Sequence, residues 1–165
     1  MGRRLAIVHY VRPMGAFDDR LAALGVELPP PMPPAGIYVP CVRSGGVLYV
    51  GGHGPVAGQT VVRGKVGRDL TLEEARDAAR MTGLSLLATV RAELGSLDGL
   101  RRLVKVFGMV NCAPGFNQTP AVIDGCSGLF VEIFGDAGQH TRTAVGMAEL
   151  PFDIAVEIEM IAELA

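Results

Sequence analysis

Hydrophobic and polar positions alternate with different periods along the chain, and each period predicts a different element. Between residues 71 and 94, apolar side chains recur every three or four positions, which is typical of an amphipathic helix. Thr71 and Glu74 form a capping-box sequence, in which each side chain binds the other residue's backbone amide, so the helix begins here. Gly95 is a natural stop because glycine readily adopts the left-handed conformation that ends helices. We therefore expect one long helix that ends at about Leu94.

Shorter runs of β-branched and aromatic residues, separated by glycine, predict strands on both sides of this helix. The sequence Arg-Ser-Gly-Gly at 43–46 predicts a hairpin turn. A second helix is expected over 120–134, before Gly135. The expected strands cover residues 37–39, 47–50, 60–62, 103–110, 143–150 and 154–161. This order predicts an α+β domain in which two long helices pack on one face of a mixed sheet.

The first 35 residues have a different character. A short helix-like segment at 17–25 is followed by five prolines within residues 28–34, a run that favours extended backbone and predicts a stiff arm. We therefore divide the chain into an N-terminal extension, residues 1–35, and a single domain, residues 36–165.

Composition and charge exclude several classes of protein. Of the 165 residues, 49% are hydrophobic and 19% are charged, so the chain can bury a core and is not intrinsically disordered. A net charge of −2 argues against affinity for nucleic acid through many phosphate contacts. No apolar run approaches the ~20 residues of a membrane-spanning helix. Three widely spaced cysteines are too few for a disulfide scaffold and fit a reducing compartment, so we expect a cytoplasmic protein.

Three motifs with possible chemistry are weak. The glycine-rich stretch 51–55 is followed by an expected strand, whereas a dinucleotide-binding loop is followed by a helix; a bulge and a close approach to a ligand both stay open. Residues 125–128 (Gly-Cys-Ser-Gly) lack the spacing of a nucleophile elbow and fall inside an expected helix. His9, His53 and His140 are far apart, so no metal site is expected.

The C-terminal strand is more informative, because Glu157 and Glu159 stand among apolar residues. A buried carboxylate is costly unless it is paired or hydrated. In one interpretation these glutamates face solvent or pair with arginines across a subunit boundary. In the other, one of them activates water near Arg142, which immediately precedes the expected strand 143–150 and whose guanidinium can hold a carboxylate through two parallel hydrogen bonds.

The order of these motifs resembles the Rid family, also called YjgF-like or L-PSP endoribonuclease-like. The resemblance runs from about residue 36 to residue 164. Its pieces are residues 36–40, 51–55, 64–67, 104–111, 141–145, 150–151 and 156–159. It implies a chorismate-mutase-like fold, assembled as a homotrimer with clefts between subunits.

The resemblance also implies an activity, namely hydrolysis of reactive enamines and imines such as 2-aminoacrylate to 2-keto acids and ammonia, without cofactor or metal. Arg142 matches the family's carboxylate-binding arginine, and Glu157 matches the glutamate that positions the attacking water. The implied substrate-binding residues are Tyr38, Gly52, His53, Asp124 and Ala144.

The chain departs from the family pattern at four positions. Gly51 stands where serine or threonine is common, His53 where many members carry glutamine, and Ala144 where some carry cysteine. Asp124 stands near the usual place of an asparagine, and its charge is expected to weaken binding of a carboxylate. Two alternatives therefore stay open. One is a non-catalytic trimer that binds small carboxylates or acts like a chaperone; the other is RNA cleavage or translation inhibition, which would need a basic surface that this sequence lacks.

Overall fold

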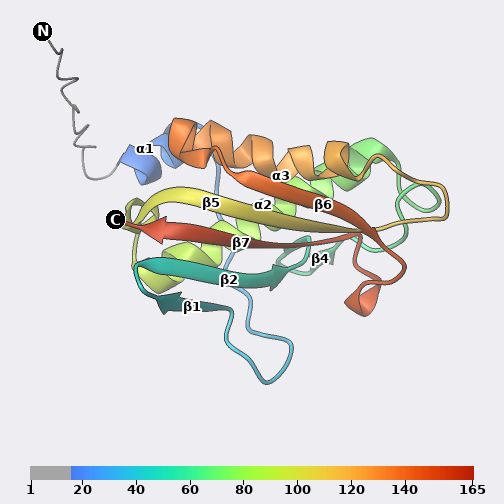
Figure 1. Ribbon diagram of the computed structural model, residues 1–165, viewed down its shortest axis with the longest axis horizontal. Coiled ribbons are helices and arrows are strands. Elements are labelled where there is room, and N and C mark those ends of the chain that lie inside the picture. Colours follow the sequence, from blue (N-terminus) through green and yellow to red (C-terminus); the bar gives the residue numbers. More distant parts are fainter. Residues whose placement is uncertain (1–15) are drawn as a thin grey trace, which may run out of the picture.

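A five-stranded sheet forms the centre of the computed structural model, which describes residues 16–165. The strands lie in the order β1-β2-β7-β5-β6, and β5 and β6 run parallel while the other neighbours are antiparallel (Figure 1). Their bounds are Cys41–Ser44 for β1, Val47–His53 for β2, Leu100–Asn111 for β5, Thr141–Met147 for β6 and Val156–Leu164 for β7. The predicted mixed sheet is confirmed, and residues 45 and 46 form the predicted hairpin turn between β1 and β2.

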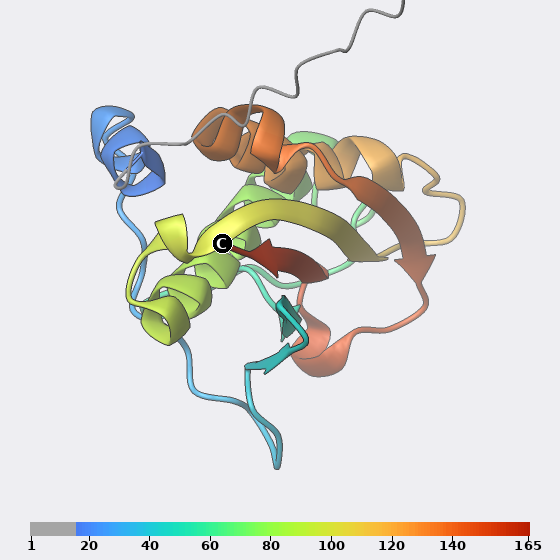
Figure 2. The ribbon, with the colours of Figure 1, turned by 60° about the vertical axis from the view of Figure 1, so that its left-hand side comes forward.

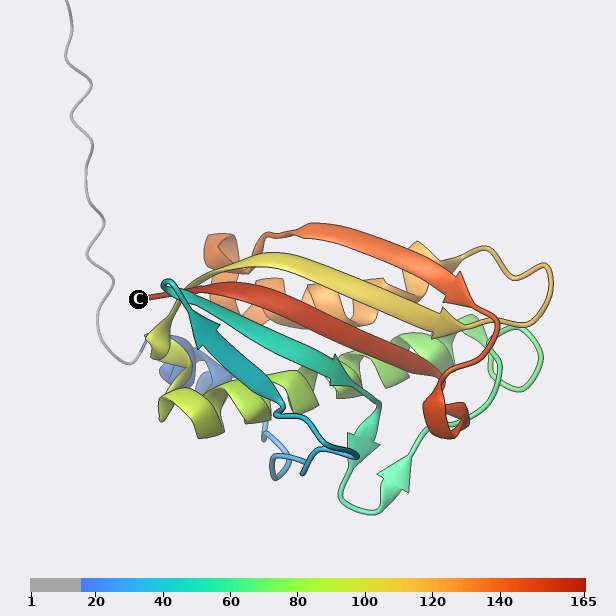
Figure 3. The ribbon, with the colours of Figure 1, turned by 60° about the horizontal axis from the view of Figure 1, so that its bottom comes forward.

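Two long helices, α2 (Leu72–Leu94) and α3 (Thr119–Phe134), pack on one face of this sheet. Figure 3 shows both helices behind the strands, and no helix within the described chain covers the near face. Gly125 of α3 touches the backbone of α2, because a Cβ there would overlap the carbonyl oxygen of Arg76. The predicted α+β architecture, with both helices on one face, is confirmed.

The ends of α2 match the sequence pattern. The Thr71 hydroxyl accepts a hydrogen bond from the Glu74 amide (3.3 Å), and the Glu74 carboxylate accepts one from the Thr71 amide (2.8 Å). These bonds to Thr71 lower the pKa of the Glu74 carboxyl. Gly95 ends the helix with a left-handed φ of 80°.

The two faces of the sheet differ in chemistry. Along β7, one set of side chains is buried under the helices: Val156, Ile158, Met160 and Ala162. The alternating positions face the other side, and three of these four are acidic: Glu157, Glu159, Ile161 and Glu163. Because neighbouring strands continue each face, the register allows every site residue to be assigned to one side of the sheet.

The N-terminal segment contributes to the same core. Helix α1 (Ala16–Ala23) buries Phe17 and Leu21, and the Phe17 ring meets that of Phe134 edge to face at 4.6 Å. Figure 2 shows α1 beside the C-terminal end of α3, with the arm running from it toward the sheet. His9 and the rest of residues 1–15 lie outside the described residues, and the domain boundary at residue 35 stays a prediction.

The strand expected at 37–39 is wrong. These residues form bends, and the first strand begins at Cys41. Pro33, Pro34 and Pro40 surround the segment and have no amide hydrogen to donate, and the Ile37 side chain is fully exposed. β-Branched composition therefore yields no strand where no neighbouring strand is available.

The remaining elements are short. A small hairpin joins β3 (Val56–Ala57) to β4 (Thr60–Val61), and 3₁₀ turns lie at Leu97–Gly99, Gly135–Gly138 and Pro151–Asp153. Strand β6 begins at Thr141 rather than at residue 143, so Arg142 lies within the strand instead of before it. The last 3₁₀ turn interrupts the chain between β6 and β7, which delays β7 to Val156.

Candidate functional site in two halves

A cavity of about 180 Å³ lies where the arm meets β2 and β7. Four of the predicted site residues line it, namely Tyr38, Gly52, His53 and Glu157. The rest of its wall is largely apolar and is formed by Met32, Pro33, Pro34, Ala35, Pro40, Gly54, Val56, Pro151, Phe152 and Ile154. We call this group the cavity half-site.

Glu157 reaches the cavity from β7, where it lies beside Met109 of β5 on the face without helices. Burial, and secondarily the charge of Glu159, raises the pKa of the Glu157 carboxyl. Gly52 makes room for this group, because a Cβ at that position would overlap Oε1 of Glu157. The β2–β7 register shifts between Val50 and His53, so the glycine-rich stretch forms a bulge, and the close approach at Gly52 is to the Glu157 side chain.

His53 is buried and both of its ring nitrogens are bonded within the fold. Nδ1 lies 2.8 Å from the Gly51 carbonyl oxygen, which can only accept, so Nδ1 carries the proton. Nε2 then accepts a hydrogen bond from the Thr89 hydroxyl of α2 at 2.8 Å. Burial lowers the pKa of His53, so the ring is neutral. His53 therefore ties the bulge of β2 to α2 and presents ring carbons to the cavity.

The Tyr38 side chain folds back and binds the backbone of the arm. Its hydroxyl accepts a hydrogen bond from the Ala35 amide at 3.0 Å, and its ring lines the cavity. The ring is 54% exposed, so Tyr38 stands at the mouth rather than in the interior.

The second group, which we call the arginine half-site, lies between β6 and α3. Nη1 of Arg142 donates to Oδ1 of Asp124 (2.7 Å) and to Oγ of Ser127 (3.0 Å), and Nη2 donates to the Pro120 carbonyl (3.2 Å). The Arg142 side chain is 22% exposed, whereas that of Asp124 is 52% exposed. Nε of Arg142 has no hydrogen-bond partner among residues 16–165, so the edge formed by Nε and Nη2 keeps donors for a ligand.

A chain of hydrogen bonds that runs through His140 and Ser127 holds the Arg142 guanidinium in place. His140 Nδ1 donates to the Gly138 carbonyl (2.6 Å), so the neutral ring accepts from the Ser127 hydroxyl at Nε2 (3.1 Å). Burial, and to a lesser extent the charge of Arg142, lowers the pKa of His140 and favours this neutral form. The Ser127 oxygen is thereby left to accept from Arg142. Sequence reasoning missed Ser127 and His140; the available signal was the three-residue spacing of Asp124 and Ser127, which puts both on one face of α3.

Ala144 belongs to the arginine half-site by position. It lies two residues after Arg142 on β6, packs against the core, and its carbonyl accepts a hydrogen bond from the Thr119 hydroxyl at 3.1 Å. This bond fixes the start of α3 against β6. Ala144 has no polar side-chain atom to offer a ligand.

Within one chain the two half-sites lie on opposite faces of the sheet. Arg142 is the neighbour of Val106, which is fully buried under the helices, whereas Glu157 is the neighbour of Met109 on the other face. The cavity beside Glu157 includes no atom of Arg142. The structure therefore does not bring the two predicted catalytic residues together in a single copy.

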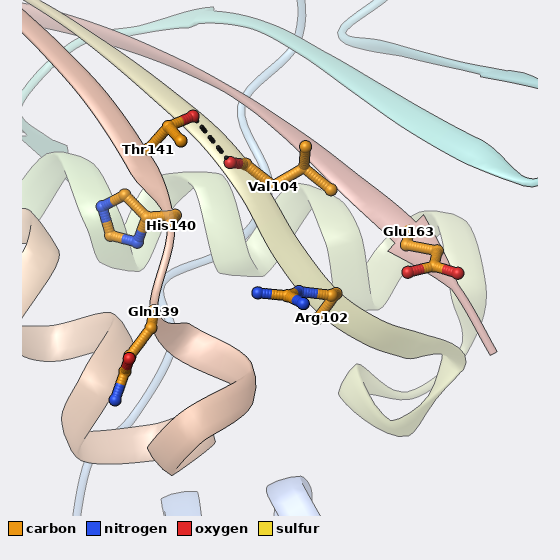
Figure 4. A pocket seen from close by; sticks show the side chains of 6 residues that line it. All are labelled: Arg102, Val104, Gln139, His140, Thr141 and Glu163. Atoms are coloured by element: carbon orange, nitrogen blue, oxygen red, sulfur yellow. Dashed lines mark hydrogen bonds between the residues drawn. The ribbon is translucent and has the colours of Figure 1, made fainter.

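A larger hollow, of about 550 Å³, lies at the edge of β5, β6 and β7 (Figure 4). It is lined by Arg102, Val104, Gln139, His140, Thr141 and Glu163. Four of these six residues are exposed, and the Thr141 hydroxyl is bonded to the Val104 carbonyl (3.0 Å). None of the predicted site residues lines this hollow. Because its walls leave it open to solvent, the smaller cavity at Glu157 is the better place for chemistry.

The fold agrees with what comparison with known proteins shows. Residues 18–164 match the family described as "YjgF/chorismate mutase-like, putative endoribonuclease". This chain belongs to that family. The resemblance to the YjgF-like or Rid proteins is thus confirmed.

Three relatives illustrate the range of the family. Protein TCP17 of Trypanosoma cruzi is 40% identical over 154 residues, which cover 91% of this chain and 95% of that protein. The crystal structure of Atu1372 from Agrobacterium tumefaciens is 40% identical, covers 90% of this chain and 92% of its own, and superposes with a TM-score of 0.82. Escherichia coli TdcF, solved with bound serine, is 25% identical, covers 84% of this chain and 94% of its own, and has a TM-score of 0.55.

Residues 16–165 contain neither a membrane-spanning helix nor a metal-binding group of side chains. None of their helices combines the length and apolarity needed to cross a membrane. Nor do His, Cys, Asp and Glu side chains gather there in a group of three able to hold a metal ion.

Proposed function

We propose that the protein hydrolyses 2-imino acids, and enamines that tautomerise to them, to 2-keto acids and ammonia, at sites to which two copies of the chain each contribute one half. The observation that carries this proposal is the half-buried Glu157 carboxyl, which faces a cavity that no described Lys or Arg side chain lines. The cation that an imino acid needs is on the opposite face of the same chain. A homotrimer, which the family resemblance implies, would bring an arginine half-site of one copy to the cavity of the next.

Each half has a distinct task. Arg142 would bind the substrate carboxylate through Nε and Nη2, and so orient the imine carbon. Glu157, whose pKa is raised by burial, would take a proton from the attacking water. TdcF, a family member solved with bound serine, supports a small ligand with an amino-acid carboxylate.

The reaction involves no oxidation or reduction. Water adds to the carbon–nitrogen double bond of the imine: its oxygen bonds to the carbon, and one of its protons passes through Glu157 to the nitrogen, which gives a carbinolamine. The carbon–nitrogen bond then breaks while Glu157 takes the remaining hydroxyl proton and passes it to the departing nitrogen, which leaves as ammonia. The bond electrons stay with nitrogen, and the carbon becomes the carbonyl of a 2-keto acid.

Mixed oligomers test both the activity and the shared site. We expect the Arg142→Ala and Glu157→Gln variants each to release little pyruvate from 2-aminoacrylate generated in situ. Co-expressed, they should regain about a quarter of the wild-type rate, because each site draws its two halves from different copies. The double variant co-expressed with wild type is the matched control. It should give about a quarter of the wild-type rate for a shared site and about half for a site within one chain. Absence of recovery in the first mixture would overturn the shared site, and a wild-type protein without activity would overturn the deaminase.

The Nε of Arg142, which has no hydrogen-bond partner among residues 16–165, favours one second candidate, a trimer that binds small carboxylates without turnover. This alternative predicts 2-keto acid binding that is lost in Arg142→Ala, with no ammonia release from any imine. RNA cleavage is a weaker candidate, because a chain with a net charge of −2 does not favour the many phosphate contacts that RNA binding needs. We also propose a cytoplasmic location, since Cys41, Cys112 and Cys126 are all free thiols.

A further inference from the structure

We infer that the cavity at Glu157 is the subsite for the substrate's side chain, and that it takes a branched aliphatic or aromatic group in preference to the small carbon of 2-aminoacrylate. This inference rests on the proposed function and deepens it by naming the substrate class. Four observations carry it: the chemistry of the wall, the volume, the placement of Phe152, and the support beneath Phe152.

The wall of the cavity offers little to a polar ligand beyond Glu157. Met32, Pro33 and Pro34 of the arm form one side, and Phe152 and Ile154 contribute from the other. His53 also lines it, yet both of its nitrogens are bonded to Gly51 and Thr89. An apolar wall with one carboxylate at its edge fits a hydrocarbon group attached to a reacting carbon.

The volume of about 180 Å³ sets the size of that group. An apolar cavity of about 150 Å³ is large enough to bind benzene. A phenyl or isobutyl group therefore fits here with little space left. A single methylene carbon would leave most of the apolar wall in contact with water, and would lose the hydrophobic stabilisation that a larger group gains by burying it.

Phe152 stands at the rim in an unusual conformation. Its side chain is 71% exposed, and it and Asp153 both have positive φ angles, 57° and 56°. Non-glycine residues are strained in this region, and they persist there where the surroundings hold them. The chain thus places a large aromatic side chain in solvent, at a fixed position beside the cavity, against its local backbone preference.

A polar network built around the buried Asn111 holds this turn in place. Nδ2 of the fully buried Asn111 donates to Oδ1 of Asp153 (2.9 Å), and the Gly64 amide donates to the Asp153 carbonyl (2.8 Å). Lys65 in turn donates to Oδ1 of Asn111 (2.9 Å), and Nε of Arg63 donates to the Phe152 carbonyl (3.2 Å). Phe152 is therefore preorganised, and an aromatic or branched ligand group can pack against it without first ordering it.

Binding of 2-keto acids, the expected products, tests this subsite without requiring turnover. Phenylpyruvate and 4-methyl-2-oxopentanoate should bind at least about 10-fold more tightly than pyruvate, because they fill the cavity. Phe152→Ala should weaken phenylpyruvate binding about 2- to 10-fold and leave pyruvate binding within about 2-fold. Phe152→Leu should keep the preference for 4-methyl-2-oxopentanoate over pyruvate. Val131→Ala, which removes an exposed apolar side chain on α3, is the matched control and should change neither affinity.

The outcomes separate this inference from the proposed function. Equal affinity for pyruvate and phenylpyruvate, or equal weakening of both by Phe152→Ala in a folded protein, overturns the subsite. Imines generated in situ from leucine, phenylalanine and serine give the second readout. Hydrolysis of all three at equal rates overturns the inference while the deaminase stands. Size-selective, Phe152-dependent binding without hydrolysis of any imine supports the subsite while the deaminase falls.

Discussion

The surroundings of Glu157 and of Arg142 differ in how each charge is balanced. Glu157 lies in a mostly apolar cavity beside another acid, Glu159, and the pKa of its carboxyl is raised. Arg142 is held by one carboxylate, one hydroxyl and one backbone carbonyl, all from α3. One half-site thus keeps an acid without a counter-ion, and the other keeps a cation that already has one.

This difference suits two different tasks. A carboxyl group with a raised pKa is a stronger base when it is ionised, which suits a group that takes a proton from water. A guanidinium fixed by three bonds holds its direction, which a binding group requires, although its acid partner competes with the ligand. Reactivity and positioning are therefore placed in separate parts of the chain, and changes in each part should have separable effects.

The largest expected effect is the loss of the base. Glu157→Gln should lower kcat for imine hydrolysis by about 10²–10⁴-fold. The same change should raise stability at neutral pH. Because the pKa of Glu157 is raised in the folded state, the contribution of its protonated carboxyl to the free energy of unfolding is fully present below the ordinary carboxyl pKa. That contribution is lost as the pH rises through the folded-state pKa. Glutamine does not ionise, so its advantage should appear at pH 7 and vanish at pH 4.

Thermal unfolding at the two pH values, with kcat measured in parallel, checks this prediction. The titratable groups that face Glu157 are Glu159 on β7, His53 on β2 and Tyr38 of the arm. Glu159→Gln is the matched control. It should retain activity and shift the rising limb of the pH–rate profile to lower pH, because it removes the charge that helps to raise the pKa of Glu157. A Glu157→Gln protein that is less stable than wild type at pH 7 would contradict the electrostatic account.

The next largest effects are expected from replacing two glycines, Gly52 and Gly125, by alanine. A Cβ at Gly52 would displace the flexible Glu157 carboxylate, so Gly52→Ala should lower kcat about 10- to 100-fold and keep the fold. A Cβ at Gly125 would meet the rigid backbone of Arg76, so Gly125→Ala should lower the free energy of unfolding by about 1–3 kcal/mol. Denaturant unfolding and turnover, measured on both variants, separate the two results. A destabilised Gly52→Ala protein with normal turnover would argue against the placement of Glu157.

The smallest effect should come from Asp124. Asp124→Asn keeps an oxygen that can accept from Arg142 and removes the competing charge, so the affinity for 2-keto acids should rise about 2- to 5-fold. The gain should shrink at high salt, because the Asp124 side chain is 52% exposed. Titrations at two ionic strengths measure it. Arg80→Gln, which breaks the Arg80–Glu132 ion pair between α2 and α3, is the control and should leave the affinity unchanged.

Sequence patterns predicted the local elements well and the assembly of the site poorly. Thr71, Glu74 and Gly95 marked the ends of α2 because capping depends on neighbouring residues alone. The strand expected at 37–39 failed because a strand needs a partner, and prolines flank this segment. Ser127, His140 and Phe152 gave weak signals, because their roles depend on contacts with residues 13 to 89 positions away.

The two long helices, the mixed sheet and the family could be predicted from the sequence alone, because each follows from periodicity, capping or the order of short motifs. The face of the sheet on which each catalytic residue lies depends on strand register, which only the folded chain shows. Because side chains alternate from one face to the other, the pairing of Arg142 with Val106 and of Glu157 with Met109 puts cation and acid on opposite sides. Local sequence does not encode that pairing, because it forms only when strands far apart in the chain hydrogen-bond to one another and pack against the same hydrophobic core.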